Sequence, residues 1–277
     1  MTIFPDAPRS PWYAALRQRP RAFHALRQDP RVSYTVHAPA GFFTAPEGHR
    51  LIVAIHGSGR GATAYRDAFA SFADRHRCVV LAPLFPIGIC GDGYADGYKN
   101  ILEGDVRYDQ LLLAMIADIE EAAGYSFGRF HLNGFSGGGQ FAHRFFYLHP
   151  QRLASVSIGA PGMVTRLDSE RDWWAGTRDL PVVFGTALSL DDMRRVAVQM
   201  VVGADDVEVL SVPAKLKPLI DSLGPVGRNR IERLQLLKEN FEAAGIPVCL
   251  DLVPGVAHEG LKVVPTIQEF IRSQVSE

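Results

Sequence analysis

The chain has 277 residues, of which 47% are hydrophobic, and its 29 lysines and arginines nearly balance 30 aspartates and glutamates, giving a formal net charge of -1. This length and apolar content suit one domain, residues 1–277, with a large core. The charges are balanced and form no long run of one sign, so the sequence shows no basic patch that would bind nucleic acid or an anionic membrane. We therefore expect a small-molecule partner, with no nucleic acid and no membrane bound.

Three cysteines, Cys78, Cys90 and Cys249, are scattered without a Cys-x-x-Cys spacing. Such a set indicates neither a zinc site nor a disulfide framework, so we expect buried free thiols. Residues 1–50 are interrupted by prolines and contain no apolar run like the core of a signal peptide. No segment approaches the ~20 consecutive apolar residues that span a bilayer. The sequence therefore predicts a cytoplasmic protein.

Apolar runs and helical periodicities alternate along most of the chain. Strands are predicted at residues 51–55, 78–82, 129–133, 153–158, 199–202 and 248–252, with an antiparallel edge strand at 32–36. Helices are predicted at residues 62–76, 105–123, 140–148, 228–244 and 261–275. This order predicts an α/β fold, a mostly parallel eight-stranded sheet with helices on both faces. The segment 159–195, which contains two tryptophans, is expected to form either a small lid or a surface excursion.

The most informative motif is Gly134-Phe135-Ser136-Gly137-Gly138, which lies between a predicted strand and a predicted helix. In this context a Gly-x-Ser-x-Gly turn is a nucleophile elbow, where a strained backbone lifts the serine Oγ clear of the sheet. Glycines flank the serine because a Cβ there would collide with the neighbouring strand and helix. Ser136 is therefore the candidate nucleophile.

A serine hydroxyl is a weak nucleophile unless a base accepts its proton, so a histidine and an acid are needed at other strand ends. His258 follows the last predicted strand and is the candidate base; in a non-catalytic role it would cap the final helix. Asp205 and Asp206 follow the preceding strand, and a short turn can present either carboxylate to the imidazole. Glu208 is a further candidate for the acid. In a non-catalytic role, both aspartates would only cap a helix or lie solvated in the turn.

An activated serine also requires an oxyanion hole, two backbone N–H groups of which each is worth roughly 3–4 kcal/mol. Gly137 supplies one N–H through its position directly after the nucleophile. The second is expected from the loop at residues 56–60, which begins His-Gly and follows a buried strand. In this loop Ser58 N–H is the first choice and Gly59 N–H the second.

The same loop fits a second class of protein, because Gly57-x-Gly59-x-x-Ala62 between a strand and a helix matches the dinucleotide fingerprint. That site needs an acidic residue about 20 positions further on, which holds the ribose hydroxyls. Residues 78–83 contain none, and His56 suits an oxyanion loop better than a pyrophosphate turn. The sequence therefore favours a hydrolase over a nucleotide-binding protein.

From Val36 to His258 the chain resembles the α/β-hydrolase superfamily, and more narrowly the esterases that include polyhydroxybutyrate depolymerases and feruloyl esterases. The resemblance is carried by residues 37–41, 56–57, 134–139, 203–206 and 254–258. The chain order serine, aspartate, histidine is that of the superfamily. The Gly-x-x-Asp spacing that ends at Asp206 resembles the acid turn of many members, which favours Asp206 over Asp205.

The resemblance implies a Ser136-His258-Asp206 triad that cleaves a carboxylic ester through an acyl-enzyme intermediate, without a metal or organic cofactor. Members that degrade extracellular polymers usually carry a signal peptide and disulfides. Neither is apparent in this sequence, so we expect a small-molecule ester as substrate. Aromatic side chains in loops after the strands are expected either to line the substrate pocket or to fill the core: Phe85, Tyr94, Tyr98, Phe135, Trp173 and Trp174.

The motifs leave two alternatives open. The same triad can cleave a peptide, thioester or lactone bond or transfer an acyl group, and the elbow does not distinguish these reactions. A hydrolase-like fold can also serve only as a binding protein, which would require a distorted triad or a closed pocket. Arg60 and Arg107 are expected either to bind a substrate carboxylate or to pair locally.

Overall fold

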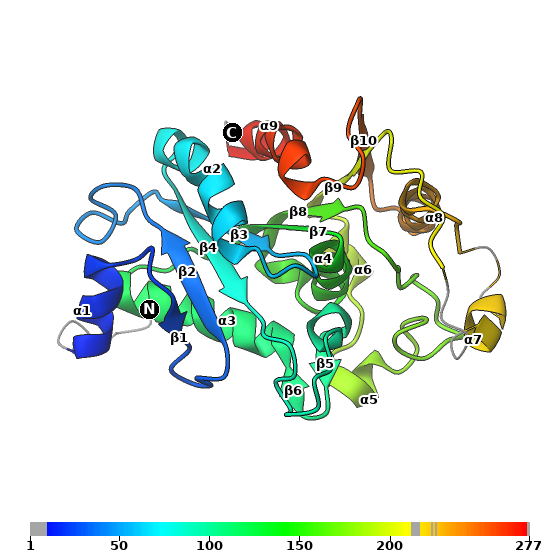
Figure 1. Cartoon of the computed structure of the whole chain (residues 1–277), viewed down its shortest axis with the longest axis horizontal. Helices are drawn as coiled ribbons and strands as arrows, with labels where there is room; N and C mark the ends of the chain where they lie inside the picture. Colours follow the sequence, from blue (N-terminus) through cyan, green and yellow to red (C-terminus); the bar gives the residue numbers. More distant parts are fainter. Residues whose placement is uncertain (1–9, 212–216, 223, 225, 276–277) are drawn as a thin grey trace.

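In the computed structural model, residues 10–211, 217–222, 224 and 226–275 are described. Within them, eight strands form one sheet in the order β1-β2-β4-β3-β7-β8-β9-β10 (Figure 1). The strands are β1 (His24–Ala25), β2 (Ser33–His37), β3 (Arg50–Ile55), β4 (Cys78–Leu84), β7 (Phe130–Phe135), β8 (Leu153–Gly159), β9 (Ala197–Gly203) and β10 (Val248–Val253). The six strands from β4 to β10 are parallel, as the alternation of predicted strands and helices indicated.

The N-terminal strands complete one side of the sheet. β2 pairs antiparallel with β4, as predicted for residues 32–36, but the prediction that it forms the sheet edge is wrong. β1 covers the outer side of β2 through the pairs His24–Tyr34 and Ala25–Ser33. A strand of two residues is too short to show an alternating pattern, so it escapes detection in the sequence.

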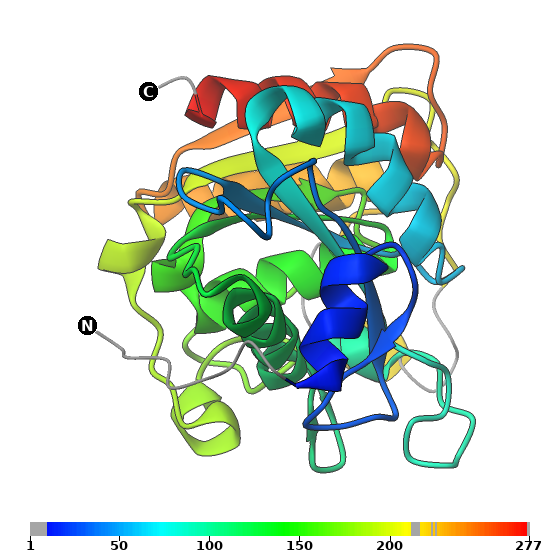
Figure 2. The ribbon, with the colours of Figure 1, turned by 90° about the vertical axis from the view of Figure 1, so that its left-hand side faces the viewer.

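Helices cover both faces of the sheet, as predicted. α2 and α9 lie side by side on one face, and α3 and α4 lie on the other (Figure 2). α8 packs against β9 and β10, and α1 packs against α3. The longer helices are α1 (Pro11–Gln18), α2 (Ala62–His76), α3 (Tyr108–Ala123), α4 (Gly137–Leu148), α8 (Arg230–Ala243) and α9 (Val264–Val275).

Three helices begin three residues away from their predicted starts. A hairpin of β5 (Leu102–Glu103) and β6 (Val106–Arg107) delays α3, and the 3-10 turn η5 (Gly260–Val263) delays α9. α4 begins earlier than predicted because its first residues are glycines, whose low helix propensity is overridden by packing. The remaining short elements are η2 (Gly97–Asn100), η3 (Pro150–Arg152), α5 (Leu180–Phe184), α6 (Leu190–Met193) and α7 (Lys217–Ser222).

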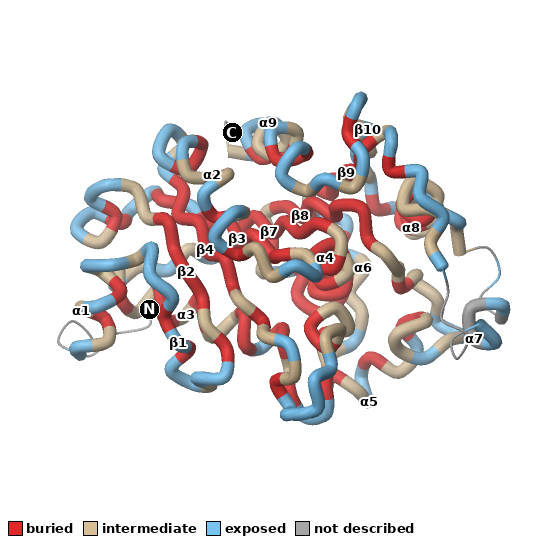
Figure 3. Tube along the Cα trace, in the orientation of Figure 1, coloured by how far each residue is buried: buried red, intermediate tan, exposed pale blue. Residues whose placement is uncertain are grey.

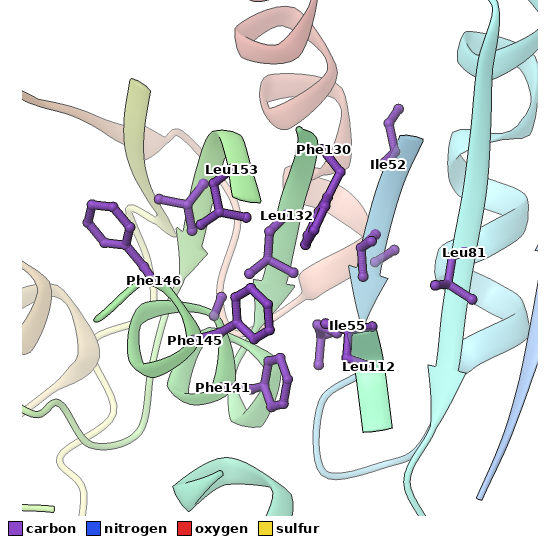
Figure 4. Close-up of a cluster of buried hydrophobic side chains, with 14 of the residues drawn as sticks. Ile52, Ile55, Leu81, Leu112, Phe130, Leu132, Phe141, Phe145, Phe146 and Leu153 are labelled. Carbon is purple, nitrogen blue, oxygen red and sulfur yellow. The ribbon is translucent and has the colours of Figure 1, made fainter. Parts of the chain in front are cut away.

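The core lies between the sheet and the helices on its two faces, and buried residues follow the central strands (Figure 3). On the α4 face, Phe145 points toward Leu132 of β7, and Phe141 stacks against Phe145 (Figure 4). Phe141 and Phe145 are fully buried, and burying a side chain of this size contributes on the order of 1.5–3 kcal/mol. This packing fixes α4, and therefore the residue at its N-terminus, against the sheet.

The cysteines are free thiols, as expected, but the expectation that they are buried holds only for Cys78. Burial raises the pKa of the Cys78 thiol to about 11. Cys90 lies in the loop after β4 and Cys249 on the outermost strand β10, where no further layer covers them, and both are exposed. No helix among the described residues is long and apolar enough to cross a membrane.

A buried carboxylate lies where the N-terminal segment meets α3. Asp118 on α3 is 6% exposed and accepts a hydrogen bond from the Tyr34 hydroxyl at 3.3 Å. The Arg27 guanidinium lies 3.8 Å from it, too far for a good hydrogen bond. Burial therefore outweighs the attraction of Arg27 and raises the pKa of Asp118 to about 6.

We expect Asp118→Asn to stabilise the protein at neutral pH. Because the folded-state pKa is raised above 3.8, protonated Asp118 stabilises the fold below about pH 4, and this stability is lost as the pH rises through about 6. The variant should gain roughly 1–3 kcal/mol of unfolding free energy at pH 7.5 and little at pH 4. Urea unfolding at both pH values measures this. The exposed Asp191→Asn is the control, and an equal gain at both pH values would contradict the assignment.

Candidate active site

The elbow forms at the junction of β7 and α4. Ser136 has φ 59° and ψ -115°, a left-handed conformation that is strained for a residue with a side chain. Its N–H donates to Gly159 O at 2.8 Å, which ties the turn to β8. A Cβ on Gly134 would collide with the backbone of Gly138, and a Cβ on Gly138 would collide with Ile55 O. The glycines of the motif therefore have the steric role that the sequence predicted.

Three side chains from the ends of β7, β9 and β10 meet at this turn. The hydroxyl of Ser136 lies 3.0 Å from Nε2 of His258, and Nδ1 of His258 lies 2.7 Å from Oδ2 of Asp206. Because a carboxylate only accepts, Nδ1 carries the proton and Nε2 is free to accept one from the serine. The carboxyl ends of parallel strands share one edge of the sheet, which explains why residues 122 and 52 positions apart meet.

The geometry distinguishes the acidic candidates at the end of β9. Asp206 is 1% exposed and faces His258, whereas Asp205 is exposed and its N–H donates to Val256 O. The carboxylate of Glu208 contacts Arg230 instead of the imidazole. A Cβ on Gly203 would overlap Val256 O, so this glycine allows the two turns to approach. Of the three acids, Asp206 is the one that the fold brings to His258.

The loop at residues 56–60 lies beside the nucleophile, since a Cβ on Gly57 would be 3.6 Å from the Ser136 Cβ. Its first residue is buried His56, whose Nδ1–H donates to Gly57 O at 2.8 Å and whose Nε2 accepts from Phe85 N–H at 3.1 Å. Burial lowers the pKa of His56 to about 4, so this imidazole is neutral. The carbonyl groups of Ile55 and His56 lie against Gly138 in the first turn of α4, where Gly137 N–H has no acceptor within the helix. The roles of Ser58 N–H and Gly59 N–H stay predictions.

The two arginines with open roles pair locally. Arg60 donates to Ser58 O at 2.7 Å and to Ala95 O at 2.5 Å, which clamps the loop at 56–60 against the loop after β4. Arg107 forms a two-pronged ion pair with Asp109, at 2.8 and 2.7 Å. Arg60 therefore holds two loops together, and Arg107 pairs at the start of α3.

The aromatic candidates fall into two groups. Phe135 packs on the His258 ring at 4.8 Å between centroids, and Tyr98 lies against Gly137, so both contact the site. Tyr94 is 46% exposed, and no contact joins Tyr94, Trp173 or Trp174 to the three central side chains within the part of the chain that is described. Phe85 is fully buried and belongs to the core.

The two tryptophans lie in the segment 159–195, beside the far half of α4. Trp173 Nε1–H donates to Asn100 O at 3.2 Å, and its ring packs edge-on against Phe184 at 4.9 Å. The guanidinium of Arg144, two turns along α4 from Ser136, lies within about 6 Å of both indole rings. The tryptophans therefore pack near Arg144 of α4 and away from Ser136. The lid role of the segment 159–195 stays a prediction.

A residue that the sequence did not indicate completes the site. Arg230 Nη1 donates to Asp206 Oδ1 at 2.8 Å and to Glu208 Oε2 at 3.1 Å. Arg230 is the first residue of α8, where a cation is disfavoured by the helix dipole. That unfavourable placement is the one signal in the sequence, but its partner carboxylates lie more than 20 residues earlier in the chain.

Several solved structures are similar to this chain, although no protein-family model and no curated protein sequence matches it. A poly(3-hydroxybutyrate) depolymerase from Bordetella parapertussis is 24% identical, with a TM-score of 0.74 over 98% of this chain and 94% of its own. Poly(aspartic acid) hydrolase-1 from Sphingomonas sp. KT-1 is 21% identical, with a TM-score of 0.69 over 86% and 91% of the two chains. An S-formylglutathione hydrolase from Agrobacterium tumefaciens is 16% identical, with a TM-score of 0.62 over 92% and 93%.

These likenesses span almost the whole of each chain and share the parallel sheet with helices on both faces. The chain therefore has the α/β-hydrolase fold, which confirms the fold class expected from its sequence. At this level of identity the fold is what carries over, because one fold hosts many activities.

We predict that Arg230→Met slows the reaction of Ser136 with a fluorophosphonate roughly tenfold, equivalent to about 1.4 kcal/mol. Without Arg230, Asp206 Oδ1 loses a charged donor inside a buried site, and the carboxylate no longer has one fixed orientation. The labelling rate of purified protein measures this effect. The proton NMR signal of His258 Nδ1–H should also weaken or move upfield, which a loss of distant packing would not cause.

Arg228→Met is the matched control, since Arg228 is exposed and its side chain pairs with Glu232. Equal labelling rates for Arg230→Met and Arg228→Met, together with an unchanged Nδ1–H signal, would remove Arg230 from the site.

Proposed function

We propose that the protein is a serine hydrolase that cleaves a carboxylic ester, with Ser136 as nucleophile, His258 as general base and Asp206 as the orienting acid. The hydrogen-bonded row from Ser136 through His258 to Asp206 carries the proposal. The names of similar structures add support, because they include a polyester depolymerase, an S-formylglutathione hydrolase and a ferulic acid esterase.

In the first half of the reaction Ser136 Oγ bonds to the ester carbonyl carbon, and its proton passes to His258 Nε2. The electron pair of the C=O bond moves to oxygen, and this oxyanion accepts hydrogen bonds from Gly137 N–H and from Ser58 N–H, with Gly59 N–H as the second choice. The pair then returns, the bond to the alcohol breaks, and His258 donates its proton to the leaving oxygen. Asp206 stabilises the imidazolium in between.

In the second half a water molecule attacks the acyl group on Ser136. His258 accepts a proton from the water and then returns it to Ser136 Oγ as the acyl–oxygen bond breaks. The products are a free carboxylic acid and regenerated Ser136. His258 Nε2 accepts and donates each proton in turn, from Ser136 to the leaving alcohol and then from water back to Ser136.

The proposed substrate is a small ester, whose acyl or alcohol part would contact Phe135, the aromatic side chain that packs on His258. Thioester, lactone and peptide bonds pass through the same tetrahedral intermediate, so a substrate panel has to separate them. p-Nitrophenyl esters of increasing acyl length, a thioester and a short peptide form a suitable panel. Preference for the oxygen esters in kcat/KM is the expected result.

We predict that Ser136→Ala lowers kcat on p-nitrophenyl acetate and butyrate roughly 10⁴- to 10⁶-fold, because no other group replaces the nucleophile. Spectrophotometric release of p-nitrophenol measures this. Ser273→Ala, on the exposed side of α9, is the control and should retain full activity. Ester hydrolysis that persists in Ser136→Ala would exclude this mechanism.

A fluorophosphonate probe separates catalysis from a binding role. The wild-type chain should gain one adduct, which mass spectrometry of peptides should locate on Ser136. A wild-type chain that neither labels nor hydrolyses any ester of the panel would instead be a binding protein with a hydrolase fold.

A further inference from the structure

The Tyr98 side chain reaches the residue that follows the nucleophile. Tyr98 lies in η2 and is 1% exposed, yet a Cβ built on Gly137 would overlap its hydroxyl oxygen. The phenol oxygen therefore occupies the position next to Gly137, whose N–H is a proposed oxyanion donor.

The ring is held on several sides, so the hydroxyl has little freedom to move. The Arg60 guanidinium covers the ring at 5.0 Å from its centroid, and the rings of His56 and Phe85 lie at 5.0 and 5.8 Å. η2 itself is fixed by a close approach, because any Cβ on Gly97 would overlap the Glu103 side chain. A donor held in advance in this way costs no reorganisation during a reaction.

The Tyr98 O–H is only weakly engaged. It points to His56 O at 3.4 Å, the long limit of a hydrogen bond. The Ser58 side chain also interacts with this oxygen in a way that favours its charged form, as a hydroxyl that donates to it does. Burial nevertheless raises the pKa of Tyr98 well above its ordinary range, so the phenol keeps its proton.

We propose that the Tyr98 hydroxyl is a third donor of the oxyanion hole, beside the N–H groups of Gly137 and the loop at residues 56–60. This role rests on the proposed function. When Ser136 Oγ bonds to the carbonyl carbon and the C=O pair moves to oxygen, Tyr98 O–H turns from His56 O to the oxyanion, and no proton is transferred. A long hydrogen bond to a neutral carbonyl is replaced by a hydrogen bond to the charged oxyanion. Because the oxyanion exists only in the intermediate, this exchange lowers the activation barrier without tightening substrate binding.

Lys99 is the other polar side chain next to Gly137, but its Nζ forms an ion pair with Asp96 at 2.5 Å. An ammonium group engaged in this way has less to offer the oxyanion than a phenol with a 3.4 Å bond. Tyr98 is therefore the side chain that the geometry favours for this role.

The test is Tyr98→Phe, measured with an oxygen ester and with its thionoester, in which the attacked carbon carries sulfur. We expect kcat on the oxygen ester to fall roughly 10- to 100-fold with KM nearly unchanged, since two backbone donors remain. Sulfur accepts weaker hydrogen bonds, so the thionoester rate should fall much less. Tyr34→Phe, which also removes a buried hydroxyl, is the control and should leave both rates unchanged.

The outcomes separate this role from packing and from the proposed function. An active wild type whose two rates fall equally in Tyr98→Phe, or do not fall, overturns the oxyanion role. 3-Fluorotyrosine at position 98 keeps the packing and is a stronger donor, so it should raise the ratio of oxygen-ester to thionoester rates, and an unchanged ratio would again overturn the role. A wild type that hydrolyses no ester overturns the proposed function itself.

Discussion

The close approach of backbones around Ser136 is the constraint on which the rest of the site depends. β3, β7, β8 and α4 meet here without side chains between them, because Gly134, Gly138, Gly139 and Gly159 each leave no room for a Cβ. The phenylalanines on the buried face of α4 hold the helix in this contact (Figure 4). Packing of the core thus offsets the strain at Ser136, which costs on the order of 1–3 kcal/mol. Relaxing the contact would move the hydroxyl and the first N–H of α4 together.

Both oxygens of Asp206, the buried carboxylate of the site, have hydrogen-bond partners. Asp206 accepts from His258 on one oxygen and from Arg230 on the other, and a buried charge without such partners would be costly. The positive charge of Arg230 is unfavourable at the N-terminus of α8 because of the helix dipole. Its ion pairs with Asp206 and Glu208 offset this cost. The N–H of Leu210 donates to Arg228 O at 2.9 Å, so both ends of the excursion between β9 and α8 are joined beside the acid. A backbone hydrogen bond therefore joins the same two segments that the ion pair of Asp206 and Arg230 joins.

The parts of this molecule that sequence could predict are those with local signals. Apolar runs located seven of the eight strands, and the glycines around Ser136 indicated a turn in which a Cβ would collide with neighbouring backbone. His258 followed from the convergence of strand ends. The adjacency of Asp205 and Asp206 left both open, and the Gly-x-x-Asp spacing favoured Asp206. Burial of the side chain distinguishes them in the structure, because it depends on how the turn packs against Val256 O. Arg230 had no comparable signal, since its partners are set by long-range packing and by no motif.

The loop at residues 56–60 matched both an oxyanion loop and a nucleotide fingerprint in sequence, and its interior explains why the two patterns look alike. In both, a strand ends in a tight turn whose N–H groups point toward negative charge. A dinucleotide site needs no buried imidazole at this position. Here Nδ1–H of His56 donates to Gly57 O within the turn, and its Nε2 accepts from Phe85 N–H in the loop after β4. Burial lowers the pKa of His56 to about 4, so Nε2 stays unprotonated in mild acid and keeps accepting from Phe85 N–H, while Nδ1–H donates to Gly57 O in either form. The loop proposed to supply oxyanion donors is therefore held by a neutral histidine, and under the proposed function a loss of activity in mild acid would have to originate elsewhere in the site.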